Sequence, residues 1–458
     1  MPSSAVPCLY LTLLTTALIA SGACASDATA PPPVDAPPSA VEAATLAQEV
    51  RQLASMRGIG PLERPAPVRS ELVELGRLLA FDKELSGNRD IACMTCHLPG
   101  LGTGDARSLS IGQGATGLGP DRVHPDNLFI PRNAPAAFNL HALESFFWDG
   151  RVHRGARSIA TPAGVKVPPA MQSVFEFGAL SALPLFPVVS REEMRGSQDQ
   201  NELAKPKDTN PQQVWKLLMR RLGAIPEYRD RFEAAYPGTG FDQMTFAHAS
   251  NAIAGFLSSD FVFDDSPWDR FLTGDDAALT EVELRGAKNF MSARCSVCHN
   301  GPAFTDNQFH NVVVAQIGPG TGDGPSRTDD YGRMKVTGRG ADRYAFRTPP
   351  LRNVELTAPY GHDGAIVDLR DFIAHYSESD LKLEQYSVLQ LEPMLHGTLQ
   401  HNFAELMATR DTLLNGVVFD DVTIDEVTAF MRALTDPAAR HLDWVIPARV
   451  PSGLAVDR

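Results

Sequence analysis

The chain has 458 residues, of which 43% are hydrophobic and 21% charged. This composition is typical of a soluble globular protein, and the length suggests two or three domains. The formal net charge of −14 at pH 7 argues against nucleic-acid binding, because a phosphate backbone would be repelled. A basic or dipolar redox partner remains compatible with that charge.

The first 25 residues have the pattern of an export signal. An apolar run over 9–20 precedes Ser21-Gly22-Ala23-Cys24-Ala25, which offers an Ala-x-Ala cleavage site after Ala25. We therefore predict a signal peptide over 1–25 and a periplasmic mature protein. A lipoprotein anchored at Cys24 is the alternative, although Ser21 is a poor match for the Leu usual at that position. Residues 26–64, rich in Pro and Ala, are expected to form a flexible tether.

Two predicted helices each precede a Cys-x-x-Cys-His string. Apolar residues at 72, 75, 78 and 79 predict a helix over 70–79, and the first string follows at 93–97. A capping box from Thr280 to Glu283 opens a second helix that reaches about residue 291. The second string follows it at 295–299. After removal of the signal peptide with its Cys24, every remaining cysteine lies in one of the two strings.

The Cys-x-x-Cys-His spacing is typical of c-type haem attachment. The two thiols add to the porphyrin vinyl groups, and the adjacent His binds the iron as proximal ligand. Buried thiols or a zinc site are the alternative, but each string supplies only three zinc ligands without a matching fourth. We therefore predict two covalent haem c groups, held by Cys93, Cys96 and His97 and by Cys295, Cys298 and His299.

The two halves of the chain repeat a series of motifs in the same order. Arg132-Asn133 followed by Trp148-Asp149-Gly150 is echoed by Arg352-Asn353 followed by His362-Asp363-Gly364. We predict a mainly α fold with two cytochrome c-like haem domains related by duplication and joined by long irregular loops. Turn-rich residues at 264–278 mark the boundary, so the domains are predicted at 65–270 and 271–447.

Taken together, these strings resemble the bacterial di-haem cytochrome c peroxidase family, which includes the protein-modifying enzyme MauG. The resemblance covers residues 65–445. It rests on the two haem strings and on Ser110-Ile111-Gly112, Pro131–Pro135, Phe147–Arg151, Glu193-Met194, Asp330–Arg333, Leu351–Val354 and Pro359-Tyr360.

The resemblance implies a role for several residues. The N-terminal haem would meet hydrogen peroxide and the C-terminal haem would handle electrons. Glu193, after Pro187-Val188, would be the catalytic carboxylate that moves a proton between the peroxide oxygens; the alternative is a solvated surface charge. Trp148 would carry electrons between the haems, a role that does not exclude packing as a core aromatic.

The resemblance also implies a calcium ion between the domains. The positions that hold it in the family fall on Asn133, through its side chain, and on Thr357 and Pro359, through their carbonyl oxygens, with waters completing an all-oxygen shell. The alternative for Asn133 is a turn cap. Relatives are often dimers, so the resemblance implies a homodimer as well.

The sequence departs from the family pattern at two iron-facing positions. Gln113 stands where many members have a displaceable His, so the N-terminal iron is expected to be open to peroxide; His124, His141 and His153 are candidate substitutes. Standard peroxidases of the family have a Met ligand to the C-terminal haem. This chain has Tyr376 at that position, as the MauG branch has a Tyr. Its rivals are His375 and Met394. The family's distal-pocket Gln aligns with Leu183.

These expectations favour an enzyme that reduces hydrogen peroxide with electrons from a small cytochrome c or cupredoxin. Three alternatives stay open: a MauG-like oxidase that modifies residues of a partner protein, a di-haem electron carrier without peroxide chemistry, and a haem-based peroxide or gas sensor. A carrier should keep six-coordinate iron at both centres, which the loss of His at position 113 disfavours. Fold and ligand type do not name the electron donor or substrate.

Overall fold

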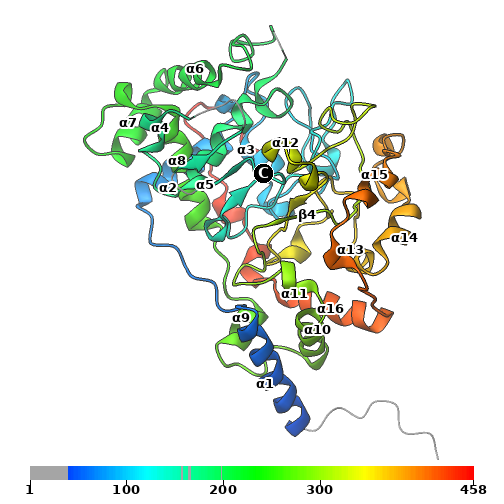
Figure 1. Ribbon diagram of the computed structural model, residues 1–458. Coiled ribbons are helices and arrows are strands. Elements are labelled where there is room, and N and C mark those ends of the chain that lie inside the picture. The colour runs from blue at the N-terminus through cyan, green and yellow to red at the C-terminus, as the bar shows by residue number, and fades with distance from the viewer. Residues whose placement is uncertain (1–39, 156–157, 163–166, 198) are drawn as a thin grey trace, which may run out of the picture.

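The computed structural model of the protein describes residues 40–155, 158–162, 167–197 and 199–458. The chain is mainly helical, and its helices gather in two groups that meet along irregular loops (Figure 1). The predicted signal peptide, including Cys24, lies outside the described residues. Within the described part of the chain, no helix combines the length and the apolar character that a membrane crossing requires.

The helices and strands alternate with short 3₁₀ turns. The helices are α1 (Ala40–Met56), α2 (Ser70–Phe81), α3 (Cys93–Cys96), α4 (Pro169–Gln172), α5 (Ala179–Ala182), α6 (Pro211–Gly223), α7 (Pro226–Ala235), α8 (Phe246–Asp260), α9 (Pro267–Leu272), α10 (Glu281–Ser292), α11 (Cys295–Cys298), α12 (Met334–Thr337), α13 (Leu369–Tyr376), α14 (Ser379–Glu384), α15 (Phe403–Ala408) and α16 (Asp421–Ala433). The strands are β1 (Ser145–Phe146), β2 (Val152–Arg154), β3 (Ile159–Ala160), β4 (Phe309–His310) and β5 (Phe346–Arg347).

The strands form two small antiparallel sheets, β1-β2-β3 and β4-β5. Phe146 faces Val152 in the first sheet, and Phe309 faces Arg347 in the second. Each sheet lies in the loop region that follows a Cys-x-x-Cys-His string, so the sheets shape the irregular walls rather than the helical cores.

Helix α2 packs against α8 at the centre of the N-terminal group. The residues at 72, 75, 78 and 79 that predicted this helix are all buried. Gly76 lets the two backbones approach closely, since a Cβ at this position would lie 1.9 Å from the carbonyl oxygen of Ala252. The glycine therefore sets the distance between the two helices.

Helices α10 and α16 repeat this contact in the C-terminal group. The predicted capping box is present, with Glu283 Oε2 accepting a hydrogen bond from the Thr280 N–H at 2.7 Å. A Cβ at Gly286 would lie 1.9 Å from the carbonyl oxygen of Glu426. Each Cys-x-x-Cys-His string thus follows a helix held by the same glycine-mediated contact.

The start of the described chain belongs to the C-terminal group. Ala47, Val50 and Ala54 of α1 are buried in the same apolar cluster as α10 and α16, and Figure 1 shows α1 beside α9 and α10. The tether predicted over 26–64 is therefore wrong for residues 40–56. Prolines dominate the first part of the predicted tether, but its later residues carry an apolar stripe. Packing of this stripe against α10 offsets the conformational entropy that is lost when the helix forms.

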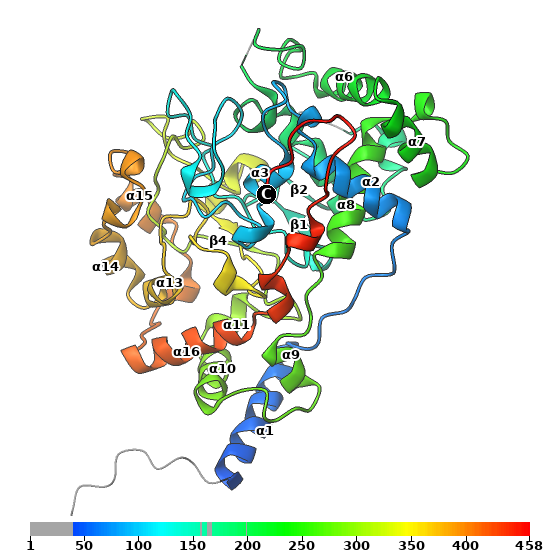
Figure 2. The same ribbon diagram turned by 180° about the vertical axis from the view of Figure 1, so that it is seen from behind.

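The end of the chain returns in the opposite direction. Leu442, Val445 and Val450 are buried in the N-terminal apolar cluster, and both views place the C-terminus against the N-terminal group (Figure 2). Ser452 Oγ donates to the buried carboxylate of Asp82 at 2.6 Å. The C-terminal domain was predicted at 271–447, but the last residues of this range pack in the N-terminal core, because their apolar side chains are buried there.

Candidate active site

The first Cys-x-x-Cys-His string forms the helical turn α3. Cys93 and Cys96 are free, partly buried cysteines, and burial raises the pKa of both thiols, that of Cys93 to about 12. His97 Nδ1 lies 3.0 Å from the carbonyl oxygen of Thr103, which orients the ring and leaves Nε2 as the nitrogen directed to a metal.

The second string, in α11, repeats this arrangement. Cys295 and Cys298 are free, partly buried cysteines, and burial raises the pKa of Cys295 to about 12. His299 Nδ1 lies 3.0 Å from the carbonyl oxygen of Phe304. Burial lowers the pKa of His299 to about 4, so the imidazole is neutral, as an iron ligand must be.

One cavity of about 590 Å³ is lined by both strings. All four of their cysteines and both of their histidines face it. The predicted site residues Glu193, Trp148, Tyr376, Asn133, Thr357 and Pro359 also line this cavity. Residues from distant parts of the sequence are thus brought to one continuous internal space.

Glu193 comes from a π-helical turn, Arg191–Arg195, whose N-cap Ser190 accepts from the Glu193 N–H at 3.4 Å. Its side chain is 23% exposed and lies 3.9 Å from Arg151 Nη2. Burial raises the pKa of Glu193, while the Arg151 charge opposes that rise. A carboxyl group whose pKa is raised holds its proton more readily than an ordinary glutamate, which suits a group that accepts a proton and returns it.

Trp148 and Asn133 are joined by a hydrogen bond in the wall of the cavity. The Trp148 indole Nε1 donates to the Asn133 carbonyl oxygen at 2.9 Å, and the Trp148 carbonyl oxygen accepts from the Arg347 N–H at 2.8 Å. The Asn133 amide nitrogen donates to the Arg107 carbonyl oxygen at 2.9 Å. Its Oδ1 is therefore the side-chain atom that could meet a cation.

Tyr376, the last residue of α13, lines the cavity at the second string. Burial, together with the nearby Cys298 and Cys295 thiols, raises the pKa of Tyr376. A phenolate at this position therefore needs a compensating cation such as ferric iron. The Tyr376 phenol lines the same cavity as His299 and would therefore be a candidate ligand for an iron bound there.

Similar proteins share this organisation. Residues 70–277 match the family model of the di-haem cytochrome c peroxidases. Cytochrome c551 peroxidase of Pseudomonas aeruginosa is 32% identical over 318 residues, which are 69% of this chain and 75% of the relative. This chain belongs to the di-haem cytochrome c peroxidase family. It is therefore related to oxidoreductases, and family membership implies haem c as the cofactor.

Two further relatives carry the name MauG. Methylamine utilization protein MauG of Methylorubrum extorquens is 29% identical over 319 residues, or 69% of this chain and 71% of the relative. The crystal structure of a MauG-like protein associated with microbial copper homeostasis has a TM-score of 0.58 and 26% identity. That match covers 85% of this chain and 98% of the other.

A di-haem family member needs counter-charges for the haem propionates, and Arg347 could supply one. It lines the cavity and is 4% exposed. Its Nε and Nη1 each donate only to a carbonyl oxygen at 3.4 Å. Among the described residues it has no carboxylate within ion-pair distance, and burial lowers its pKa to about 10. A buried cation without a partner fits an anionic cofactor, so the cavity suits haem.

The structure corrects the prediction for Gln113. Its side chain does not line the cavity of this family member. Its Oε1 instead accepts a hydrogen bond from the Asn88 N–H at 3.1 Å, and its amide nitrogen packs against Gly196. The side-chain oxygen of Gln113 is therefore engaged in the wall and not in the cavity. The position still supplies no blocking imidazole.

The other candidate ligands also lie away from the cavity. His124, His141 and His153 do not line it. His375 Nε2 lies 2.7 Å from the Val312 carbonyl oxygen, and Met394 is 39% exposed on the surface. Tyr376 is therefore better placed than either rival, while Leu183, at the position of the family's distal Gln, does line the cavity.

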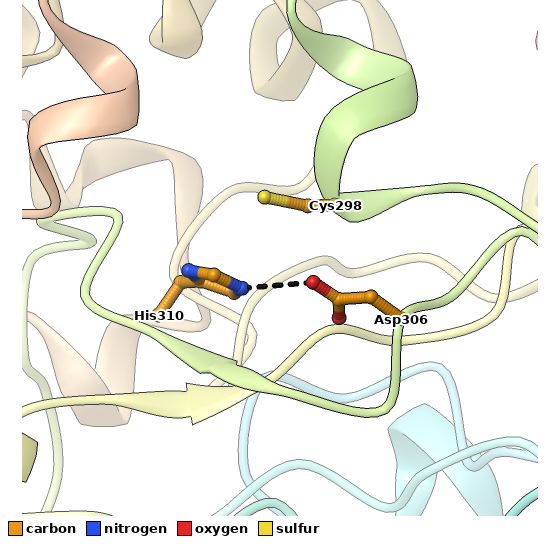
Figure 3. A group of neighbouring side chains, drawn as sticks. All are labelled: Cys298, Asp306 and His310. Atoms are coloured by element: carbon orange, nitrogen blue, oxygen red, sulfur yellow. Dashed lines mark hydrogen bonds and ion pairs between the residues drawn. The ribbon is translucent and has the colours of Figure 1, made fainter. Parts of the chain in front are cut away.

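Sequence reasoning missed a charged group beside the second string. His310 lies between the carboxylates of Asp411, 2.5 Å from Nδ1, and Asp306, 3.1 Å from Nε2. Figure 3 shows the His310 ring and Asp306 next to Cys298. Burial opposes protonation, but hydrogen bonds to Asp306, Cys298 and Asp411 raise the pKa of His310 to about 11. Both ring nitrogens of His310 are occupied by carboxylates. Cys298, Asp306 and His310 therefore form a charged part of the cavity wall rather than a metal site. The four-residue spacing of Asp306 and His310 was its only sequence signal.

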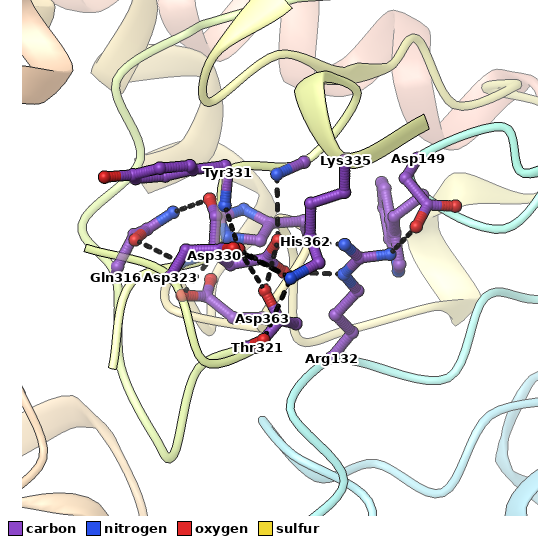
Figure 4. Close-up of polar contacts among 12 residues, drawn as sticks. Arg132, Asp149, Gln316, Thr321, Asp323, Asp330, Tyr331, Lys335, His362 and Asp363 are labelled. Carbon is purple, nitrogen blue, oxygen red and sulfur yellow. Dashed lines mark hydrogen bonds and ion pairs between the residues drawn. The ribbon is translucent and has the colours of Figure 1, made fainter. Parts of the chain in front are cut away.

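A second missed feature is an ion-pair network between the two halves. Arg132 binds Asp330 through Nε at 2.6 Å and Asp149 through Nη1 at 2.7 Å, as Figure 4 shows. Arg151 Nη1 reaches the same Asp149 oxygen at 3.2 Å and continues towards Glu193. The network links the C-terminal half to Glu193. The repeated Arg-Asn and Asp-Gly motifs contain Arg132 and Asp149 but do not reveal that these two residues pair.

Proposed function

We propose that this protein is a peroxidase that reduces hydrogen peroxide to water with electrons from a small cytochrome c or cupredoxin. The reaction H₂O₂ + 2H⁺ + 2e⁻ → 2H₂O needs a group that takes a proton from one oxygen and delivers it to the other. The observation that carries the proposal is Glu193, a carboxyl group with a raised pKa in the same cavity as His97. In this proposal the N-terminal haem is open for peroxide and the C-terminal haem relays or stores oxidising equivalents.

Each haem in the proposal has its own protein ligands. Cys93, Cys96 and His97 would hold the N-terminal haem, and haem iron would supply the redox chemistry that no side chain here can supply. Cys295, Cys298 and His299 would hold the C-terminal haem, with Tyr376 as a further candidate ligand to its iron. Trp148, in the wall of the shared cavity, is the proposed electron path. Arg151, held by Asp149, keeps the Glu193 carboxyl group oriented.

The proposal is tested by stopped-flow mixing of the as-isolated diferric protein with hydrogen peroxide. We expect the Soret band of the N-terminal haem to respond without prior reduction. Glu193→Gln should lower kcat/KM for peroxide by about 100-fold, within the usual range for a lost general acid–base. Glu384→Gln is the control, because Glu384 is an exposed glutamate that does not line the cavity. Equal losses in the two variants would remove Glu193 from the mechanism.

A second function, peroxide-dependent modification of a partner protein as in MauG, is favoured by Tyr376 in the cavity. It predicts that the diferric protein reacts with peroxide while reduced cytochrome c and reduced cupredoxin fail to support turnover. Rapid steady-state oxidation of either donor would exclude this second function as the main activity. A mere carrier would show low-spin six-coordinate iron at both centres and no response to peroxide.

We further propose that the protein is exported to the periplasm, either free or anchored through Cys24. Mass spectrometry of the mature N-terminus distinguishes the two, because a lipid on Cys24 adds a defined mass. A homodimer, as the family resemblance implies, would be seen by sedimentation.

The matching contacts of Gly76 and Gly286 support the duplication of one haem-binding unit.

We also propose a calcium ion at Asn133, Thr357 and Pro359. The support is that all three line one cavity and offer the oxygen ligands that Ca²⁺ prefers. Chelation with EGTA should alter the exchange of electrons between the haems, and Ca²⁺ but not Mg²⁺ should restore it. An effect of EGTA that Asn133→Ala leaves unchanged would place the ion elsewhere.

A further inference from the structure

Two tyrosines of the C-terminal half lead from the cavity towards the surface. Tyr344 is 1% exposed and lines the cavity. The ring of Tyr331 meets it edge to face, with ring centroids 5.4 Å apart. Tyr331 is partly exposed, and Figure 4 shows its hydroxyl directed away from the Arg132–Asp330 pair. The two rings form a continuous aromatic connection between the interior and solvent.

Tyr344 lies in the cavity wall, and a series of contacts leads from its neighbours to the second Cys-x-x-Cys-His string. It packs in one apolar cluster with Val313 and Leu406, both of which also line the cavity. The neighbouring Arg343 carbonyl oxygen accepts a hydrogen bond from Thr409 Oγ1 at 3.1 Å. Two residues further on, Asp411 binds His310, which stands beside Cys298. Tyr344 is thus the inner end of the connection.

The hydroxyl of Tyr344 has a proton acceptor in place. It donates to Asp329 Oδ2 at 2.8 Å, and Asn402 Nδ2 holds the other oxygen of Asp329 at 3.0 Å. Burial, reinforced by the Asp329 charge, raises the pKa of Tyr344, so the phenol is protonated in the resting protein. A phenol loses an electron readily only when its proton can leave at the same time, and Asp329 provides that exit.

Arg343 fixes the two rings with respect to each other. Its guanidinium group lies 4.3 Å from the Tyr331 ring centroid and 4.8 Å from that of Tyr344. It also donates to both hydroxyls, at 3.1 Å and 3.0 Å. Cation–π contacts and hydrogen bonds together hold a geometry that simple core packing would not require.

We propose that Tyr344 and Tyr331 form a redox relay that passes electrons from a reductant at the surface to the oxidised cofactor in the cavity. The relay rests on the peroxidase function proposed above and adds a route that does not pass through Trp148. It makes the surface around Tyr331 a place where a one-electron reductant, such as a small phenol or a redox protein, is oxidised.

The electrons and protons of each passage balance. The Tyr344 phenol gives one electron to the cofactor and its proton to Asp329. Tyr331 then gives one electron to Tyr344, which takes its proton back from Asp329, and the proton of Tyr331 leaves to water. One electron from the surface reductant, with a proton from water, restores Tyr331. Two passages supply the two electrons that reduce one hydrogen peroxide to two waters.

The relay is tested by trapping radicals on tyrosine in the diferric holoenzyme. The protein is mixed with one equivalent of hydrogen peroxide and the spin trap 2-methyl-2-nitrosopropane, without any reductant, and the adducts are located by peptide mass spectrometry. Freeze-quench electron paramagnetic resonance records the tyrosyl signal in parallel, and the Soret band reports the reaction with peroxide. The variants are Tyr344→Phe, Tyr331→Phe and Asp329→Asn. Tyr236→Phe serves as a control, because Tyr236 is a half-buried tyrosine of the N-terminal half that does not line the cavity.

We expect an adduct on Tyr331 in the wild type and in Tyr236→Phe. In Tyr344→Phe and Asp329→Asn that adduct should fall by about tenfold or more, while the Soret response remains. An unchanged Tyr331 adduct in Tyr344→Phe would overturn the relay, as would a Soret response with no tyrosine adduct in the wild type. A Soret band that does not respond to peroxide would overturn the proposed function and the relay with it.

Discussion

The Trp148 indole nitrogen donates its hydrogen bond to the Asn133 carbonyl oxygen at 2.9 Å. This bond joins the predicted electron path to the residue that offers its side chain to the predicted calcium ion. Since the Asn133 N–H also donates to the His362 carbonyl oxygen at 2.9 Å, one residue ties the Trp148 loop to the C-terminal half. The orientation of the indole is therefore sensitive to both halves of the molecule.

Trp148→Phe should separate the two haems functionally while leaving the first one reactive. The phenyl ring keeps the apolar packing but lacks the N–H, so the Asn133 carbonyl oxygen loses its donor at a cost of about 1–3 kcal/mol in unfolding free energy. We expect the N-terminal haem to react with peroxide at its normal rate and electron exchange with the C-terminal haem to slow by about tenfold. Stopped-flow spectra that resolve the two haems measure this; Trp444→Phe, at a 56% exposed tryptophan, is the control. Equal exchange rates in the two variants would exclude Trp148 as the path.

Gly76→Ala and Gly286→Ala should each destabilise the protein. In both cases the new methyl group would meet a backbone carbonyl oxygen at 1.9 Å, so the paired helices must move apart. Overpacking of this kind costs about 1–3 kcal/mol in unfolding free energy. Urea denaturation measures the loss. Gly240→Ala is the control, because no atom lies within 4 Å of its added Cβ; a loss of the same size there would show that the helix contact is not the cause.

Tyr376→Phe should change the absorption and paramagnetic resonance spectra of the C-terminal haem only. The substitution removes the oxygen that would bind iron and keeps the ring that packs edge to face on Phe372, at a centroid distance of 5.6 Å. A shift of the C-terminal reduction potential to a higher value is expected, because a phenolate ligand favours ferric iron. Spectra identical to those of the wild type would show that Tyr376 is not a ligand.

Asp363→Asn should make the protein more stable at alkaline pH. Burial, with help from the nearby Asp330 charge, raises the pKa of Asp363 to about 8. The folded state therefore holds a proton that the unfolded state has released above its ordinary pKa near 3.8, so the wild type loses stability as pH rises from about 4 to about 8. Asparagine retains a side-chain oxygen for the Ile317 N–H, which Asp363 accepts at 3.0 Å.

The difference in melting temperature between Asp363→Asn and the wild type should therefore increase from pH 5 to pH 8.5. At pH 8.5 the unfolding free energy of the variant should exceed that of the wild type by on the order of a few kcal/mol. Asp342→Asn is a matched control, since Asp342 has a lowered pKa and hydrogen bonds to Thr337 and Arg339. A stability difference between Asp363→Asn and wild type that does not vary with pH would show that Asp363 is ionised in the folded protein.

Local sequence patterns predicted the helices before each haem string, because periodic apolar residues and a capping box are short-range signals. The set of residues lining the cavity was predictable only through the family resemblance, since Glu193 and Tyr376 come from loops and helix ends far apart in the chain. Gln113 shows the limit of that resemblance: a motif gives the position of a residue, but the hydrogen bond with Asn88 decides where its side chain turns.

Ion pairs such as Arg132–Asp330 were beyond prediction for a related reason. Each partner lies in an irregular loop, and 198 residues separate them in the sequence. No periodicity connects such positions, and many other Arg and Asp residues could satisfy the same charge. Helix α1 was not predicted either, because Pro-rich residues precede it and its packing partner α10 follows more than two hundred residues later.

Asp457, the penultimate residue of the chain, accepts a hydrogen bond from Thr95 at 2.5 Å and pairs with Lys83 at 2.6 Å. Thr95 lies inside the first Cys-x-x-Cys-His string. The first Cys-x-x-Cys-His unit is therefore completed only once the chain has been made as far as Asp457, 362 residues after Thr95. Formation of the first haem-binding unit thus depends on a segment that is synthesised long after the second one.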